Sequence, residues 1–142
     1  MERLEGGFVL DSSVIVKWFV EEEFTNKALL FRQALLVGKI EIVASDLILY
    51  EIPNALKFSQ KLNEEDIKKV ISSLFGIGME ITVPVRRILD SAIDLSFKFN
   101  ITLYDAYFIA LAEDIGYEFI TADEKLYNKT KVLKFVKILK EF

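Results

Sequence analysis

The sequence predicts an α/β domain: a three-layer α/β/α sandwich in which helices cover both faces of a central, largely parallel sheet of about five strands. Short clusters rich in Val, Ile and Phe alternate along the chain with segments long enough for helices. A chain of 142 residues, 52% apolar and with 12 Phe, can fill one hydrophobic core but leaves no room for a second domain. We therefore expect residues 1–142 to form a single domain.

The expected strands are the apolar clusters at residues 8–10, 40–44, 80–83, 117–121 and 135–139. The expected helices lie between or after them, at residues 12–20, 25–37, 46–61, 64–77, 86–98, 102–114 and 123–131. Alternating strands and helices indicate crossover connections and hence parallel strands. In such sheets, ligands bind beyond the carboxyl ends of the strands.

Several helices carry local signals. Thr25 and Asn63 are the caps expected to begin two of them. Pro53 removes a backbone donor, so we expect it to kink or delay helix 46–61. Helix 25–37 is apolar around more than one face, which predicts either deep burial or an apolar surface offered to a second chain.

Composition limits the possible chemistry. With no Cys and no His, the chain has no thiol nucleophile, no imidazole base and no thiolate zinc site. A bound metal would have oxygen ligands, which favours Mg²⁺ or Mn²⁺. The absence of Cys, together with abundant Ile, Lys and Glu, favours a thermophilic source. No apolar run approaches the ~18 residues of a membrane span, and no signal peptide is evident, so we expect a soluble, cytoplasmic protein.

Charge is unevenly distributed along the chain. The net charge is −4, yet residues 125–142 hold six Lys and one Glu and so carry +5, which leaves −9 on the remainder. The overall acidity argues against nucleic-acid binding through a general positive field. The Lys-rich end is either a solvated face or a contact for a polyanion, and the sequence alone leaves both open.

Two acids stand where an α/β site is expected. Asp11 directly follows the first strand, and Asp123 lies two residues after Thr121 at the end of another. Each can instead be the N-cap of the following helix, since Asp is favoured there.

Glu51 lies within a helix whose apolar residues face inward, and it cannot be explained as a cap. Asp46, five residues earlier, is turned ~140° away and is better explained as a cap. Asn54, three residues after Glu51, can orient Glu51 or a ligand water, or can be a plain surface amide.

Asp105 opens the buried-looking helix 102–114, three residues after Thr102, close to a capping-box arrangement. Asp114 lies ~180° around the same helix, so the two cannot serve one site. Small alanines would let this helix approach the sheet closely and bring Asp105 near the strand ends. Asp11, Glu51, Asp105 and Asp123 are thus candidates for one cavity.

A cluster of four carboxylates needs cations. Two like charges about 5 Å apart repel by roughly 3 kcal/mol at an effective dielectric constant of about 20. Divalent ions relieve that repulsion, activate water and stabilise the leaving oxygen of a phosphodiester. Such chemistry requires no His, Cys or Ser base, which suits this composition.

Four segments, FVLDSSVIVKWF, LILYEIPNAL, LYDAYFIALAE and FITADEKLY, resemble in order and spacing the PIN domain, in particular the VapC-type toxin ribonucleases of bacteria and archaea. The resemblance runs from about Phe8 to Tyr127 and implies the fold expected above. It also implies a homodimer and a cognate VapB-like antitoxin that blocks the site.

The same resemblance implies that Asp11, Glu51, Asp105 and Asp123 bind Mg²⁺ or Mn²⁺ and cleave RNA. Thr121 matches a hydroxyl residue that helps to organise the site. Ser12 and Asn54 are further supporting candidates, and Lys17 or the Lys-rich end is a candidate guide for phosphate. Pro53 departs from the family pattern and affects how Glu51 is expected to be placed.

Two other functions remain open at this point. A receiver-type signalling module would accept a phosphoryl group on an acid at a strand end, which explains Asp11 and Thr121 but leaves Glu51 and Asp105 idle. A catalytically silent binding protein would use the acids only as caps and would bind no divalent ion.

Overall fold

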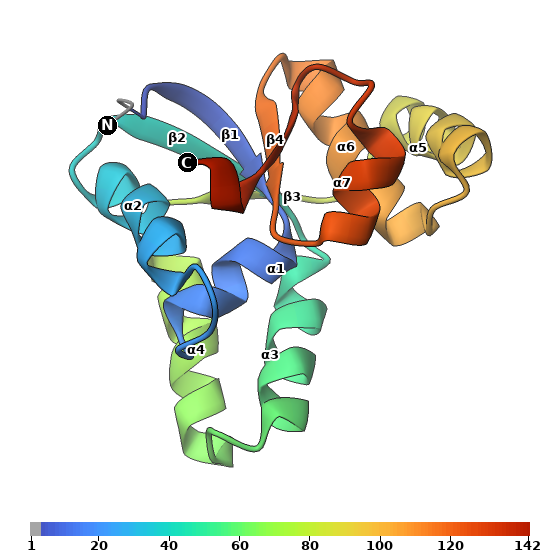
Figure 1. Cartoon of the computed structure of the whole chain (residues 1–142). Coiled ribbons are helices and arrows are strands. Elements are labelled where there is room, and N and C mark those ends of the chain that lie inside the picture. The colour runs from blue at the N-terminus through green and yellow to red at the C-terminus, as the bar shows by residue number, and fades with distance from the viewer. Residues whose placement is uncertain (1–3) are drawn as a thin grey trace.

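The computed structural model describes residues 4–142, whose centre is a five-stranded sheet in the order β3-β2-β1-β4-β5 (Figure 1). The strands are β1 (Gly6–Leu10), β2 (Ile40–Ser45), β3 (Glu80–Thr82), β4 (Glu118–Thr121) and β5 (Val136–Ile138). All neighbouring strands are parallel, which confirms the predicted sheet. The first three residues of the predicted domain lie outside the described residues.

Helices cover both faces of this sheet, as predicted. Because crossovers between parallel strands are right-handed, the helices before β3 and those after it fall on opposite faces, and Figure 1 shows α2 and α6 on the two sides. The helical elements are α1 (Ser12–Ile15), η1 (Val16–Trp18), α2 (Thr25–Leu36), α3 (Ile48–Ser59), α4 (Glu64–Gly76), α5 (Arg86–Phe99), α6 (Leu103–Ile115), α7 (Glu124–Thr130) and η2 (Leu139–Glu141).

Strand β1 forms the centre of the core. Phe8, Val9 and Leu10 are all buried, and β1 pairs with β2 on one side and with β4 on the other. A strand buried on both faces is expected to be a continuous apolar run, because neither face meets water. Asp11, the next residue, therefore lies at the carboxyl end of the central strand of the sheet.

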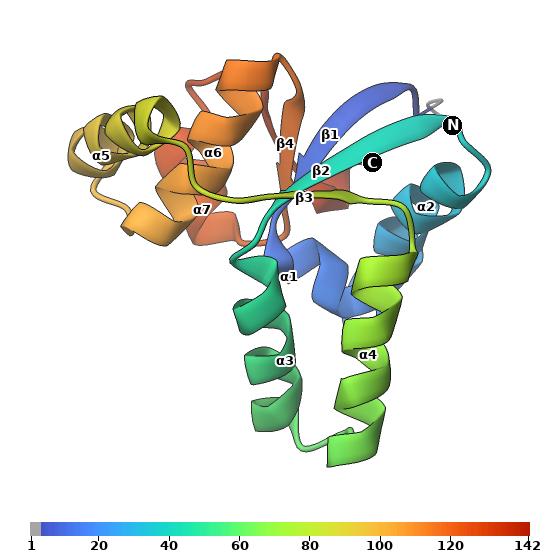
Figure 2. The same cartoon turned by 180° about the vertical axis from the view of Figure 1, so that it is seen from behind.

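Helix α6 is buried around its whole circumference. Every residue from Ala106 to Ala112 is buried, since α6 packs on the sheet while α5 covers its outer side (Figure 2). Arg87 of α5 and Asp114 of α6 join the two helices through a two-pronged ion pair. This ion pair links α5 to the last turns of α6, while Asp105 lies in the first turn of α6.

Two helices differ from the expected form. The predicted helix 12–20 is a short α1 followed by the 3-10 turn η1. Helix α3 runs through Pro53 without a break and begins at Ile48, two residues after the start predicted for helix 46–61. Pro53 lies in the second turn, where its missing N–H costs one bond to the carbonyl of Leu49 while the rest of the helix continues.

The capping expectations had mixed outcomes. Asn63 forms a reciprocal capping box with Asp66, as expected for a helix start. Helix α2 does begin at Thr25, but its N-cap is Phe24 in a left-handed conformation, so the expected cap is wrong. The Thr25 hydroxyl instead holds the preceding loop, donating to the Val20 carbonyl at 3.3 Å.

Asp46 is not the cap of α3. The N-cap position belongs to Leu47, whose N–H donates to the Ser45 hydroxyl at 3.2 Å. The backbone N–H of Asp46 donates to the carbonyl of Thr82 at 3.0 Å and so joins the ends of β2 and β3. The backbone of Asp46 therefore extends the pairing of β2 with β3 by one hydrogen bond.

Helix α2 is not deeply buried. It packs inward through Thr25, Ala28, Phe31 and Ala34, while several leucines stay partly or largely exposed: Leu29, Leu30 and Leu36. Deep burial, one of the two expected explanations for its apolar character, is therefore wrong, and a surface for a second chain stays a prediction. Within residues 4–142, none of the helices is long and apolar enough to cross a membrane.

Candidate active site

The Asp11 side chain is fixed at the carboxyl end of the sheet. Its backbone N–H donates to the Ile120 carbonyl at 2.9 Å, which extends the pairing of β1 with β4. Its Oδ2 accepts from the hydroxyls of Thr121 at 2.7 Å and Ser13 at 2.8 Å. Asp11 occupies the N-cap position of α1, but its carboxylate makes no capping bond. Capping therefore does not explain this residue.

Burial makes the Asp11 charge costly. Only 6% of the residue is exposed, and this burial raises the pKa of its carboxyl to about 6. The hydroxyls of Thr121 and Ser13 lower this pKa, and the charges of Asp105 and Glu51 raise it further. A nearby cation would therefore stabilise the charged form of Asp11.

Two hydroxyls tie Asp11 to the loop after β4. Thr121 is fully buried, and its Oγ1 also accepts from the backbone N–H of Asp123 at 3.0 Å. Ser13 Oγ accepts from the N–H of Ala122 at 3.0 Å. Each hydroxyl therefore bridges the Asp11 carboxylate and the backbone beyond β4.

Ser13 was not predicted from the sequence. A signal was present, because a Ser two residues after an Asp often bonds locally to it. The sequence cannot show that the same hydroxyl also reaches Ala122, because the neighbouring position of β1 and β4 is a property of the folded sheet.

Glu51 is connected to the same end of β1 through Ser12. The Ser12 hydroxyl donates to Glu51 Oε1 at 2.8 Å. Partial burial raises the pKa of Glu51, the Ser12 bond lowers it, and the charge of Asp105 raises it. Asn54, the other supporting candidate on α3, is exposed and lines a separate cavity between α3 and α4.

Asp105 lies at the start of α6 and is half-buried. The Thr102 hydroxyl accepts from the Asp105 N–H at 3.1 Å, so Thr102 is the cap and Asp105 is the capped residue. Burial raises the pKa of the Asp105 carboxyl, a side-chain bond with Thr102 lowers it, and the charge of Asp123 raises it. The carboxylate itself remains available to a ligand.

Asp123 is exposed and acts as a helix cap. Its Oδ1 accepts from the Leu126 N–H at 3.1 Å at the start of α7. Asp105 and Asp123 both line a cavity of about 250 Å³. Asp114 lies elsewhere on α6 in its ion pair with Arg87, as its position around the helix predicted.

Lys17 is mostly enclosed. Its side chain is only 12% exposed, and its Nζ lies 3.6 Å from Glu22 Oε1. A role in guiding phosphate would require this ion pair to open.

The carboxylates suit a divalent ion by type, since hard oxygen ligands are those that Mg²⁺ and Mn²⁺ prefer. The charge of Asp105 raises the pKa of both Asp11 and Glu51, and the charge of Asp123 raises that of Asp105, so the four acids lie near one another. Across residues 4–142, however, no three acidic side chains are already arranged to hold one ion. The site therefore has the chemistry of a metal centre without converged ligands.

Comparison with known proteins identifies the family. The PIN-domain model matches residues 8–132, most of the chain. The chain belongs to the PIN-domain family. Ribonuclease VapC3 of Pyrobaculum aerophilum is 30% identical to this PIN domain over 129 residues, which cover 88% of this chain and 95% of the relative. The resemblance read from the four sequence segments is thereby confirmed.

Solved structures share the PIN fold. A toxin–antitoxin complex from Klebsiella pneumoniae matches with a TM-score of 0.64 at 19% identity, covering 92% of this chain and 96% of that one. VapBC2 from Rickettsia felis, bound to a promoter DNA fragment, matches with a TM-score of 0.67 at 14% identity, covering 93% and 98%.

The receiver-type alternative does not fit this PIN domain. Receiver modules have the strand order 2-1-3-4-5, whereas the order here is 3-2-1-4-5. Asp11 is also buried, with one oxygen engaged by two hydroxyls, so it is poorly placed to accept a phosphoryl group.

Proposed function

We propose that the protein is a metal-dependent endoribonuclease that hydrolyses RNA phosphodiester bonds with Mg²⁺ or Mn²⁺ held by Asp11, Glu51, Asp105 and Asp123. The observation that carries this proposal is the Asp11 carboxylate. It is buried at the carboxyl end of the central strand, where two hydroxyls hold it near other acids. Family membership and the ribonuclease named among the relatives support RNA as the substrate.

The residues have different parts in this proposal. Asp11 is the fixed ligand, because its Oδ2 is held by Thr121 and Ser13 and its other oxygen makes no recorded hydrogen bond within residues 4–142. Glu51, oriented by Ser12, holds metal or positions the attacking water. When bound, a divalent ion supplies an activated water and neutralises charge that develops on the phosphodiester.

The other two proposed metal ligands lie at the starts of helices. Asp105 is oriented by the first turn of α6, and Asp123 keeps Oδ2 free while Oδ1 caps α7. These two side chains have to move inward to join Asp11 and Glu51, since the described acids are not yet converged. Ion binding and site assembly are therefore coupled.

The proposal includes partners. A VapB-like antitoxin is supported by toxin–antitoxin complexes among the structures that share the fold. A homodimer is supported by the leucines that α2 leaves exposed. Toxins of this kind act on cellular RNA, so the proposed location is the cytoplasm.

The decisive experiment incubates the purified protein with cellular RNA and Mn²⁺, beside an EDTA control and the Asp105→Asn variant. Discrete fragments are expected from the wild type with Mn²⁺ and from neither control. Glu113→Gln is the matched comparison, because Glu113 is an exposed acid on the same helix outside the site. This variant should cleave like the wild type.

Cleavage that persists in EDTA would refute metal dependence, and full activity of Asp105→Asn would remove Asp105 from the site. A silent binding protein is the alternative if no RNA is cut. Calorimetric titration with Mn²⁺ tests it, because binding that is lost in Asp105→Asn would exclude a protein whose acids serve only as caps.

A further inference from the structure

An RNA substrate meets an electrostatic obstacle at this site. Its phosphates must approach four carboxylates on a chain whose net charge is −4. Bound divalent ions compensate the acids at the bond that is cut, but the phosphates on either side also need positive partners. Lys and Arg side chains usually supply these contacts, because phosphate contacts position a nucleic acid.

Few cations lie beside the acids. Lys17 is mostly enclosed and paired with Glu22. Lys57 and Lys68 line the separate cavity between α3 and α4. Lys125 and Lys129 of α7, by contrast, line the same cavity as Asp105 and Asp123.

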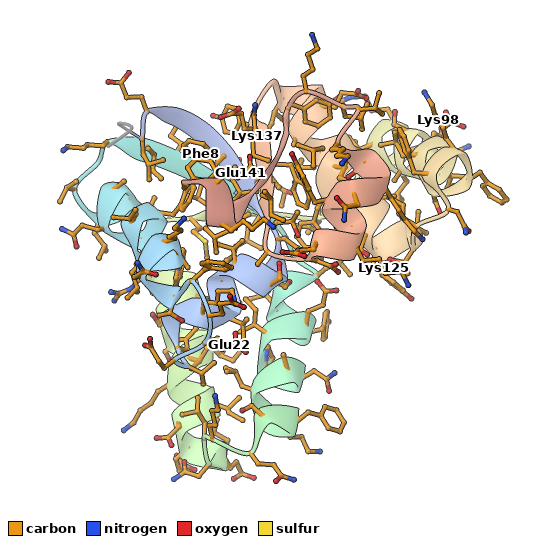
Figure 3. All side chains as sticks on the ribbon, viewed as in Figure 1. Phe8, Glu22, Lys98, Lys125, Lys137 and Glu141 are labelled. Atoms are coloured by element: carbon orange, nitrogen blue, oxygen red, sulfur yellow. The ribbon has the colours of Figure 1, made fainter. Side chains whose placement is uncertain are left out.

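The two α7 lysines differ in how they are held. Lys129 Nζ donates to the Asn100 carbonyl at 2.9 Å, across the gap between α7 and the turn before α6. Lys125 forms no ion pair within residues 4–142, whereas Lys137 pairs with Glu118 and Lys140 with Glu124. Figure 3 shows Lys125 at the edge of the molecule where α6 and α7 begin. One lysine is thus oriented and the other is free to engage an anion.

We propose that this cavity is the subsite for an RNA phosphate next to the one that is cut, with Lys125 as its principal cation and Lys129 as its second. The inference rests on the proposed ribonuclease function and names substrate contacts that the acids cannot provide. Asp105 and Asp123 line the cavity together with the two lysines, so a phosphate held by the lysines would lie next to the acids of the site.

The size and lining of the cavity agree with this assignment. Its volume of about 250 Å³ lies below the roughly 300–1,000 Å³ of pockets that enclose drug-sized ligands, so it suits a phosphate and part of its sugar. Ile101 and Leu126 add apolar surface for a ribose, and the Thr102 hydroxyl adds a polar edge. None of these groups distinguishes one base from another, so the subsite should bind RNA without sequence preference.

The test compares Lys125→Ala with Lys131→Ala. Both variants remove one positive charge from the same exposed Lys-rich segment, but Lys131 does not line the cavity. Binding of a fluorescent single-stranded RNA is measured by anisotropy in EDTA over a range of salt concentrations, and cleavage of the same RNA is measured with Mn²⁺. Lys125→Arg serves as the variant that should restore both.

Lys125→Ala is expected to weaken binding equally for RNAs of different sequence and to reduce the slope of log affinity against log salt by about 0.7, the value for one phosphate contact on a single strand. In cleavage, KM should rise while kcat changes little, because the contact holds substrate and transition state alike. Lys131→Ala should match the wild type in both assays.

The outcomes separate the two proposals. If the wild type cleaves RNA and Lys125→Ala matches Lys131→Ala in binding slope and in KM, the subsite is refuted while the ribonuclease stands. If the wild type neither binds nor cleaves RNA, the ribonuclease proposal fails and the subsite fails with it. An equal loss in both variants would assign the effect to general charge and would also overturn the subsite.

Discussion

The two halves of the acidic site are built differently. Asp11 follows a buried central strand and is held by the side chains of Ser13 and Thr121. Asp105 and Asp123 sit at helix starts, one half-buried and the other exposed, and they share a cavity with lysines. The sheet half is rigid before any ligand binds, whereas the helix half remains open.

The two halves would contribute to ion binding in different ways. On the sheet half, a carboxylate is kept in a setting that disfavours its charge, so a cation gains from neutralising it. On the helix half, side chains that solvent already reaches can turn towards an ion at small cost. The sheet half therefore supplies affinity, and the helix half completes the coordination.

The largest expected effect comes from Asp11→Asn, which should abolish cleavage and yet stabilise the metal-free fold. The folded pKa of about 6 lies above the unfolded value of 3.8, so stability that is present below pH 3.8 is lost as the pH rises through about 6. At neutral pH this loss amounts to about 3 kcal/mol, which the variant escapes. Urea unfolding in EDTA at several pH values measures it.

The pH profile provides the control. The advantage of Asp11→Asn over the wild type should shrink as the pH falls from 7 towards 4, and added Mn²⁺ should stabilise only the wild type. If the difference in unfolding free energy between Asp11→Asn and the wild type does not vary with pH, the Asp11 charge is not what destabilises the wild type.

A smaller effect is expected for Thr121→Val. This change removes the donor to Asp11 Oδ2 and the acceptor for the Asp123 N–H in a fully buried position. Leaving such groups unpaired costs about 1–3 kcal/mol of unfolding free energy, and activity should fall with it. Thr121→Ser keeps the hydroxyl and should retain more activity than Thr121→Val; a loss in Thr121→Ser as large as in Thr121→Val would contradict a specific role for the hydroxyl.

The smallest stability effect is expected at Asp123. Asp123→Asn keeps an oxygen that can cap α7 and should leave stability nearly unchanged, whereas Asp123→Ala loses the bond from Leu126 and should cost about 1 kcal/mol. Both variants lack the charge, so both should lose Mn²⁺-dependent cleavage. Thermal unfolding and RNA cleavage are measured on both variants. Equal stability of Asp123→Asn and Asp123→Ala would contradict the capping part of the role proposed for Asp123.

Local patterns were enough to predict the strands and most helix bounds, and they made the four acids candidates for one site. Asp11 could be assigned because a run such as Phe8–Leu10 identifies a central strand, and a parallel sheet places its site at that end. The family resemblance then joined residues that lie far apart in the sequence. The fold was therefore accessible from the sequence, and the composition of the site stays a prediction.

The details that were missed depend on which elements become neighbours. The strand order could not be predicted, because periodicity does not say that β1 pairs with β4. For the same reason, the bond from Ala122 to Ser13 and the cavity around Lys125 remained hidden. Phe24 took the N-cap of α2 in a left-handed conformation that aromatic residues seldom adopt, so the preference for Thr25 failed.

The pairing of β1 with β4 also determines when the enzyme can exist during its own synthesis. Asp11 leaves the ribosome early, but the hydroxyl that holds it, Thr121, and the last acid, Asp123, belong to the final part of the chain. A nascent chain that stops before residue 123 cannot build the acidic centre. The acidic centre would therefore assemble only after Asp123 has left the ribosome.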